Sequence, residues 1–328
     1  MIDKEKCRNY YYNGNVYNLG EFDEKLNDIS STIDDQSIVT KFIQEQFTKN
    51  AQAYSEKYTN FSQFETLIIN SLSKINLRPK KILDIGSGSG NTVIPLIKLF
   101  PDSEIIASDL SIELLYLLKQ NLISNNKISD NIHILQLNAE NLNFNESTFD
   151  LVIGASILHH LFSPEKTIES AYKILNDNGF LIFYEPFENG NMIIRIIFEE
   201  ILKDRRSIKI PFKVKNFLKA IITDYDFRKG SDKSNPHFSQ MDDKWLFTKN
   251  YINELSEKCG YSKCSIYPLH ETEKQFENQI SVLLKLGLGL QKEVLPKWAW
   301  EKIKEYDKYF SEDMKKDLII EGCIILKK

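Results

Sequence analysis

The sequence has few cysteines, and nothing in their spacing suggests a disulfide framework or a cysteine-held metal. Only four of its 328 residues are cysteine. Cys259 and Cys264 are the one close pair, and no second pair completes the spacing of a metal site. Scattered cysteines of this kind are most simply reduced thiols, which are typical of a cytosolic protein.

The sequence also lacks long apolar runs and an excess of positive charge. No stretch approaches the roughly 18 consecutive apolar residues that a membrane-spanning helix needs. The polar start, Met1–Arg8, has no apolar signal region. We therefore expect a soluble cytoplasmic protein. The formal net charge of −4 argues against a broad phosphate-binding surface, so we expect no nucleic-acid partner.

The most informative segment is a glycine-rich turn that follows a short apolar run. The run, Lys81–Ile85, suits a buried parallel strand, and residues 91–100 read as a helix. Between them stand Gly86, Gly88 and Gly90. Glycine permits backbone angles that are closed to other residues, and it lets main-chain N–H groups approach a ligand. The pattern predicts a nucleotide-like ligand.

Two acids flank this turn in positions that refine the prediction. Asp109 ends a second apolar run about 20 residues further on, where a carboxylate can accept hydrogen bonds from both ribose hydroxyls. Asp84 precedes a tight G-x-G-x-G, whereas a pyrophosphate-binding turn has G-x-G-x-x-G. An acid directly before the turn favours a cationic ligand over a phosphate.

An acid followed by G-x-G-x-G resembles the first motif of the class I S-adenosylmethionine-dependent methyltransferases. Residues 131–142 resemble the third strand and adenine-binding turn of that family, and residues 149–161 resemble its fourth strand. Residues 173–186 are similar to its helix, glycine turn and fifth strand. The resemblance implies an α/β fold with a doubly wound, seven-stranded Rossmann-like sheet, and S-adenosylmethionine as cofactor. No NPPY- or DPPY-type motif, typical of enzymes that methylate base amines, follows the fourth strand.

The resemblance also implies roles for individual residues. The three glycines would line the methionine moiety, with Asp84 near its amino group, and Asp109 would hold the ribose. Ala139 would donate its N–H to adenine. Asn138 stands where the family usually has Asp, and it either accepts from the adenine amine or serves as an ordinary turn residue. The complete set of expected cofactor contacts is Tyr54, Asp84, Gly86, Ser87, Gly88, Gly90, Asp109, Leu110, Asn138, Ala139, Glu140 and Ala155.

The order of patterns predicts an N-terminal segment, residues 1–77, and a methyltransferase domain, residues 78–328. The N-terminal segment contains an Asn-Gly hairpin signal within residues 10–17 and apolar residues at helical spacing over 36–77. Residues 47–58 resemble the family's N-terminal helix that folds over the cofactor, which would place Tyr54 or Tyr58 near the methionine end. For either tyrosine alone, packing with the hydroxyl in water is the simpler role.

The domain itself should hold five strands alternating with crossover helices over 80–186. A helix over 250–261, closed by Gly260, and two further strands at 263–269 and 322–328 should follow. Two insertions, at about 187–249 and 270–321, are too long for bare loops. We expect them to form a helical cap that selects the substrate.

Several side chains are candidates for the chemistry. His159 and His160 directly follow the fourth strand. Glu185, at the end of the fifth strand, is a candidate acid or base at the rim of the sheet. Within residues 236–245 we expect His237 to be a general base, with Asp243 or Trp245 shaping the acceptor pocket. Equally credible structural roles are a helix cap at Asp242 or Asp243 and a buried anchor at Trp245. Adjacent acids are not a specific metal signal, so no metal is expected.

Seven basic residues form a run in the first insertion. They form either a solvated helix face or a docking patch for an anionic group, such as a carrier-bound substrate. The run comprises Lys203, Arg205, Arg206, Lys209, Lys213, Lys215 and Lys219.

The sequence therefore predicts methyl transfer to an O, C or N atom of a small, partly apolar metabolite, with natural-product tailoring as the most specific interpretation. The alternatives are a protein or peptide methyltransferase and a non-catalytic S-adenosylmethionine-binding module.

Overall fold

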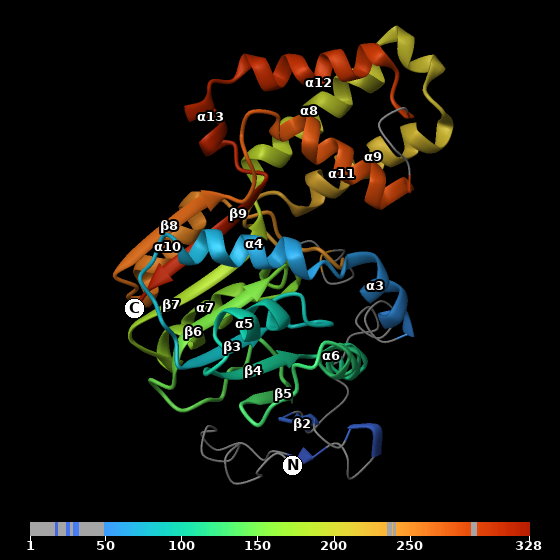
Figure 1. Ribbon diagram of the computed structural model, residues 1–328. Helices are drawn as coiled ribbons and strands as arrows, with labels where there is room; N and C mark the ends of the chain where they lie inside the picture. The colour runs from blue at the N-terminus through green and yellow to red at the C-terminus, as the bar shows by residue number, and fades with distance from the viewer. Residues whose placement is uncertain are drawn as a thin grey trace.

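A nine-stranded sheet organises the described part of the chain, with strand order β1-β2-β5-β4-β3-β6-β7-β9-β8 (Figure 1). The computed structural model describes residues 17–18, 24–26, 29–32, 49–234, 238, 241–289 and 294–328. The strands are β1 (Tyr17–Asn18), β2 (Ile29–Ser31), β3 (Lys81–Ile85), β4 (Glu104–Asp109), β5 (Ile132–Gln136), β6 (Phe149–Ala155), β7 (Leu175–Pro186), β8 (Lys263–Pro268) and β9 (Glu321–Lys327).

Strands β3 to β9 are the seven that the sequence predicts. β3 to β7 are mutually parallel, and β9 inserts antiparallel between β7 and β8. The predicted α/β sheet is confirmed, with two additional short strands at one edge. β2 pairs parallel with β5, and β1 pairs antiparallel with β2. Strands of two or three residues show too little alternation to be read from sequence. The predicted hairpin over 10–17 lies, apart from Tyr17, outside the described residues.

Helices cover both faces of the sheet because its central strands are apolar on both sides. α4 (Phe61–Leu72), α5 (Val93–Leu99) and α6 (Ile112–Ser124) pack on one face (Figure 1). α7 (Pro164–Ile174) and α10 (Lys249–Cys259) pack on the other. α3 (Ala51–Tyr58) precedes α4, so the helical prediction holds for the described part of 36–77.

Two connections differ from the predicted alternation of strand and helix. Residues 137–148, all of them described, contain no helix. The crossover helix expected between β5 and β6 is therefore absent. The predicted glycine turn before the fifth strand is an irregularity inside β7. Leu175 pairs with Phe149 and Phe180 with Leu151, and the intervening Asn178 has a φ of 64°.

The two insertions carry helices, as expected from their length. The first contains α8 (Glu188–Lys203), the short 3₁₀ helix η6 (Arg205–Lys209) and α9 (Phe212–Arg228). The second contains α11 (Gln275–Leu288), α12 (Lys297–Tyr309) and α13 (Glu312–Asp317). α8, α9, α11 and α12 share one apolar core, separate from the two cores that flank the sheet. Figure 1 shows the helices of both insertions as a layer above the sheet. We refer to them as the helical layer.

The end of the first insertion leaves the helical layer and returns to the sheet. Phe247 donates its N–H to the Pro186 carbonyl at 3.0 Å and forms a parallel bridge with Phe187. This returning segment, residues 241–247, therefore runs beside the carboxyl end of β7.

The junction between the helical layer and the sheet is tightly packed at Gly190, in the first turn of α8. A Cβ at this position would lie 2.5 Å from the carbonyl oxygen of Ile319. In an unobstructed helix alanine is favoured over glycine by up to about 1 kcal/mol. Here the backbone obstruction should reverse that preference.

We predict that Gly190→Ala lowers the free energy of unfolding by about 1–3 kcal/mol, the usual cost of overpacking. Chemical denaturation checks this. Met192→Ala, at an exposed position of the same helix, is the control and should change stability by less than about 0.5 kcal/mol. A Gly190→Ala variant as stable as the parent would show that the junction can shift freely.

Candidate functional site

The glycine turn after β3 adopts the backbone conformation for which its glycines were singled out. Gly86, Gly88 and Gly90 have φ angles of 69°, 51° and 107°. A Cβ at Gly86 would lie 2.9 Å from Ile157, and one at Gly90 would lie 2.7 Å from Leu118. At Gly88 no described atom lies within 4 Å of that position. The backbone at Gly88 therefore borders open space, where a ligand can approach it.

Asp84 lies fully buried beneath this turn. Its Oδ2 accepts a hydrogen bond from Thr92 Oγ1 at 2.6 Å. Its Oδ1 has no hydrogen-bond partner among the described residues. Burial raises the pKa of the Asp84 carboxyl to about 7, because the charged form is poorly solvated there. A buried oxygen without a partner is costly, and a cationic donor beside it would remove that cost.

Asp109, at the end of β4, connects the turn to the neighbouring strand. Its Oδ2 accepts from the Gly88 N–H and its Oδ1 from the Ser111 N–H, both at 2.9 Å. Burial raises the pKa of this carboxyl, while the backbone donors oppose the shift. Ser87 reinforces the connection, because its N–H donates to the Ser108 carbonyl and its Oγ accepts from the Ser108 N–H.

Tyr54 of α3 is half-buried close to these groups. Burial, followed by the negative charge of Asp109, raises the pKa of its hydroxyl above the usual range. Asp242 and Asp243 contribute in the same direction. The structure therefore brings α3, the ends of β3 and β4, and the returning segment to one edge of the sheet.

The residues expected around adenine lie at the same edge and make hydrogen bonds within the protein. Asn138 Oδ1 accepts from the Glu140 N–H at 2.9 Å, which is the ordinary turn role. The Ala139 carbonyl accepts from Thr167 Oγ1, and Glu140 Oε1 accepts from the Ser163 N–H. The Leu110 carbonyl accepts from Gln136 Nε2. Ala155, half-buried, ends β6.

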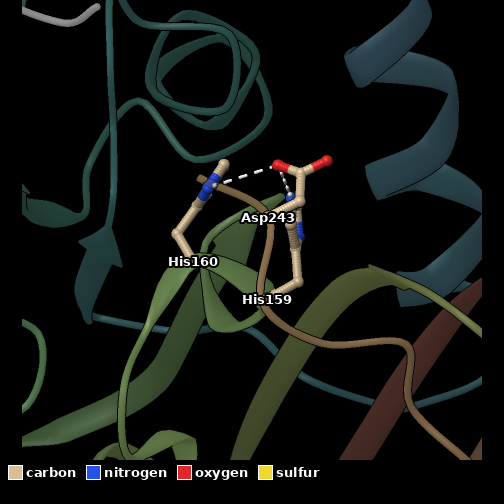
Figure 2. A group of neighbouring side chains, drawn as sticks. All are labelled: His159, His160 and Asp243. Atoms are coloured by element: carbon tan, nitrogen blue, oxygen red, sulfur yellow. Dashed lines mark ion pairs between the residues drawn. The ribbon is translucent and has the colours of Figure 1, made fainter. Parts of the chain in front are cut away.

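Two histidines and an aspartate from distant parts of the chain meet beside this edge (Figure 2). His159 and His160 lie in η5 (Leu158–His160), directly after β6, and Asp243 lies in the returning segment. Asp243 Oδ1 is 3.4 Å from His159 Nε2 and 3.5 Å from His160 Nδ1. We call these three residues the His–Asp cluster. One donor atom from each lies within 4.8 Å of the others, a spacing that could hold a metal ion.

Glu185, at the end of β7, fixes the position of the His159 ring. It is 1% exposed, and its Oε2 lies 2.6 Å from His159 Nδ1. Its Oε1 accepts from the N–H groups of Ile157 and Leu158 at 3.0 and 2.8 Å. Both oxygens are thus occupied within the protein. The expectation that Glu185 is a rim acid or base does not fit this geometry, which makes it a positioning residue.

Charges around the cluster are strongly coupled. Burial alone would lower the pKa of His159, but the negative charges of Glu185 and Asp243 outweigh it and raise that pKa to about 9. Burial would raise the pKa of Asp243, yet His159 and Arg228 hold it well below its usual range. Arg228 Nη1 lies 3.2 Å from Asp243 Oδ2.

The returning segment is bonded to the residues that follow β6. The backbone N–H groups of Lys244 and Trp245 both donate to the His159 carbonyl, at 2.6 and 3.2 Å. Trp245 Nε1 donates to the Leu161 carbonyl at 2.8 Å, and its ring stacks with Phe247. Trp245 is therefore a buried anchor. Thr248, rather than either aspartate, caps α10.

The sequence did not predict that Asp243 meets both histidines, because the two segments are far apart in the chain. The signal was present as acids and histidines clustered at strand ends, but the pairing needed the fold. His237 lies outside the described residues, so its role as general base stays a prediction.

The basic run lies on the end of α8, on η6 and on α9, in the helical layer. Its side chains are exposed, apart from half-buried Lys215. Arg206 pairs with Asp204 at 2.8 Å and stacks over Trp298, and Lys203 pairs with Glu199. None of the helices in the described part of the chain is long and apolar enough to cross a membrane.

Comparisons with known proteins agree with this geometry. Residues 83–181 match a family model described as a methyltransferase domain. The ubiquinone/menaquinone biosynthesis C-methyltransferase of Pasteurella multocida is 30% identical over 106 residues, which are 32% of this chain and 39% of that protein. A methyltransferase of Strobilurus tenacellus is 32% identical over 115 residues, 34% of this chain and 38% of that protein. The chain thus spans about two fifths of these curated relatives.

A solved structure extends the similarity in fold. Phosphoethanolamine N-methyltransferase 2 of Haemonchus contortus superposes with a TM-score of 0.53 at 13% identity. The match covers 88% of this chain and 59% of that one. Such low identity shows a common fold and no more.

The position of Glu185 generates a test of the site's architecture. Glu185→Gln should lower the free energy of unfolding by about 2–5 kcal/mol, because the amide cannot accept all the hydrogen bonds that the carboxylate accepts. Nitrogen NMR of the His159 ring should also lose the signature of a proton held on Nδ1. Glu169→Gln, which removes only an exposed partner of Lys173, is the control and should change neither. An unchanged His159 spectrum in Glu185→Gln would remove the positioning role.

Proposed function

We propose that this chain, which belongs to the class I S-adenosylmethionine-dependent methyltransferases, transfers the methyl group of S-adenosylmethionine to a small, partly apolar metabolite. The observation that carries the proposal is the turn from Asp84 to Gly90. It combines a buried carboxylate oxygen that lacks a described partner with a glycine backbone open to a ligand. A cationic ligand that also carries a ribose suits both features.

The residues present fit that cofactor. Asp84 would face the amino group of the methionine moiety, and Gly88 would lie against the moiety itself. Asp109 already accepts one hydrogen bond on each oxygen, and each carboxylate oxygen can accept a second, so the two ribose hydroxyls can be held there. Ala139 and Asn138 would border the adenine, with Asn138 in its turn role.

The bound cofactor supplies a methyl group on a positively charged sulfur, which is open to in-line attack. The chain must then hold the acceptor in line with that methyl group, which is the larger part of catalysis in such a displacement. His159 and His160 lie beside the cofactor site on the acceptor side, in our proposal, with His159 kept protonated on Nδ1 by Glu185. His237 remains our candidate for a general base.

The acceptor is chosen, we infer, by segments that lie outside the matched methyltransferase domain. The family model ends at residue 181, before both insertions. The returning segment, which belongs to the first insertion, contributes Asp243 to the cluster. The negative charges of its Asp242 and Asp243 also raise the pKa of Tyr54. Relatives named as C-methyltransferases favour a carbon acceptor, while oxygen and nitrogen acceptors stay open. The biological role that we propose for this methylation is natural-product tailoring. The acceptor can also be bound to a carrier that docks on the basic run.

The proposal predicts that purified protein binds S-adenosylmethionine and its demethylated product, S-adenosylhomocysteine, in calorimetry. It also predicts that radiolabelled methyl groups appear in a small product when the protein is incubated with cell extract. Asp109→Ala should weaken cofactor binding at least tenfold, since two charge-assisted hydrogen bonds are lost. Asp102→Asn, at an exposed turn, is the control and should bind normally.

The outcomes separate the alternatives. Cofactor binding without any labelled product would indicate a non-catalytic binding module, and label in macromolecular material would indicate a protein methyltransferase. Absence of binding to either compound would overturn the proposal.

The raised pKa of Asp84 predicts how cofactor affinity depends on pH. In the free protein Asp84 is largely protonated at pH 6, because its pKa is about 7. The ammonium of the cofactor favours the carboxylate, so binding must release that proton. Affinity should therefore rise several-fold from about pH 6 to 7.5. Calorimetry should find a flat profile for Asp84→Asn, and the parent slope for Asp102→Asn. A flat profile in the parent protein would contradict the assigned contact.

A further inference from the structure

The separations between Asp243 and the two imidazoles of the His–Asp cluster suit three ligands of one metal ion. Asp243 Oδ1 is 3.4 Å from His159 Nε2 and 3.5 Å from His160 Nδ1. Both separations exceed the roughly 2.7–3.2 Å of an N–H···O hydrogen bond. Two ligands about 2.0–2.2 Å from one tetrahedral ion lie about 3.3–3.5 Å apart. These two separations, with all three donor atoms within 4.8 Å of one another, suit a cation among the three side chains.

The surroundings orient the donor atoms as metal sites require. Glu185 Oε2 lies 2.6 Å from His159 Nδ1, so the neutral ring holds its proton there. A metal ion that displaces the proton on Nε2 would therefore meet a lone pair directed at Asp243. Carboxylate–histidine–metal arrangements of this kind fix the tautomer of a ligand and raise its basicity. Glu185 is itself fixed by the backbone of Ile157 and Leu158.

The third ligand is held from the opposite side. Arg228 Nη1 lies 3.2 Å from Asp243 Oδ2, which leaves Oδ1 facing the two imidazoles. Arg228 is buried and also donates to the Trp245 carbonyl, so it is part of the fixed framework. Asp242 Oδ1, 3.0 Å from His160 Nδ1, competes for that nitrogen now and is close enough to join the set as a further oxygen ligand.

We propose that His159, His160 and Asp243 form a binding site for a divalent transition-metal cation of the zinc or cobalt type. Two imidazoles and one carboxylate are the ligand chemistry that such ions prefer over magnesium or calcium. Three protein ligands leave a coordination position for a water or for an oxygen of the acceptor. No metal was expected from the sequence, because adjacent acids are not a specific metal signal. The three proposed ligands come from separate segments that only the fold joins.

Metal binding can be tested without cofactor and without any methyl-transfer assay. The full chain, stripped with a chelator and dialysed, is titrated with Zn²⁺ in a calorimeter, and Co²⁺ is added separately for visible spectroscopy. One Zn²⁺ per chain is expected, together with the intense d–d bands of low-coordinate Co²⁺. His160→Ala and Asp243→Asn should each weaken Zn²⁺ binding at least tenfold and abolish those bands.

A matched control is available in the chain. His270 Nε2 lies 3.0 Å from Glu321 Oε2, a histidine–carboxylate pair outside the cluster. His270→Gln should therefore leave metal binding unchanged, and circular dichroism establishes that each variant is folded.

Two results would overturn the assignment. One is absence of Zn²⁺ binding to the parent protein, which would leave the cluster as an ion pair of protonated histidine and aspartate. The other is binding that survives both His160→Ala and Asp243→Asn. Because the readout is metal binding alone, failure here leaves the proposed methyl transfer standing, and the reverse also holds.

Discussion

The buried carboxylate of Glu185 is the interaction on which one half of the site depends. It lies at the end of β7 and satisfies three backbone N–H groups after β6 as well as the His159 ring. Because an unpaired charge in this position would be very costly, the residues after β6 have little freedom to move. Their carbonyls in turn bind the returning segment, which carries Asp243 to the histidines.

The other half of the site depends on the glycine turn and the two acids that flank it. Gly88 donates to Asp109, so the conformation of the turn and the position of the second acid are coupled. Asp84 lies beneath the turn with one oxygen unsatisfied by the described residues, a local instability that a cationic ligand can relieve. The two halves meet near Tyr54. The negative charges of Asp109 and of the two aspartates of the returning segment raise the pKa of its hydroxyl.

Much of the cofactor half could be predicted from sequence, because its signals are local. Positive φ angles at Gly86, Gly88 and Gly90 follow from a short strand running directly into a helix, and Asp109 follows from the length of one strand–helix–strand unit. Asn138 was open between two roles. Its Oδ1 accepts from the Glu140 N–H, as a turn residue does, and the contact with adenine stays a prediction. Glu185 was predicted at the rim and lies buried, because strand periodicity does not indicate how deeply a strand end is covered.

The sequence by itself determined the parallel sheet, the glycine turn, both acids of the cofactor half and the helical nature of the insertions, since each is encoded by residues within a few positions of one another. Only the tertiary structure decided that helices of both insertions share one core, and that Asp243 meets His159 and His160. These contacts join segments far apart in the chain. Their geometry is set by packing and by buried hydrogen bonds, neither of which leaves a periodic trace in the sequence.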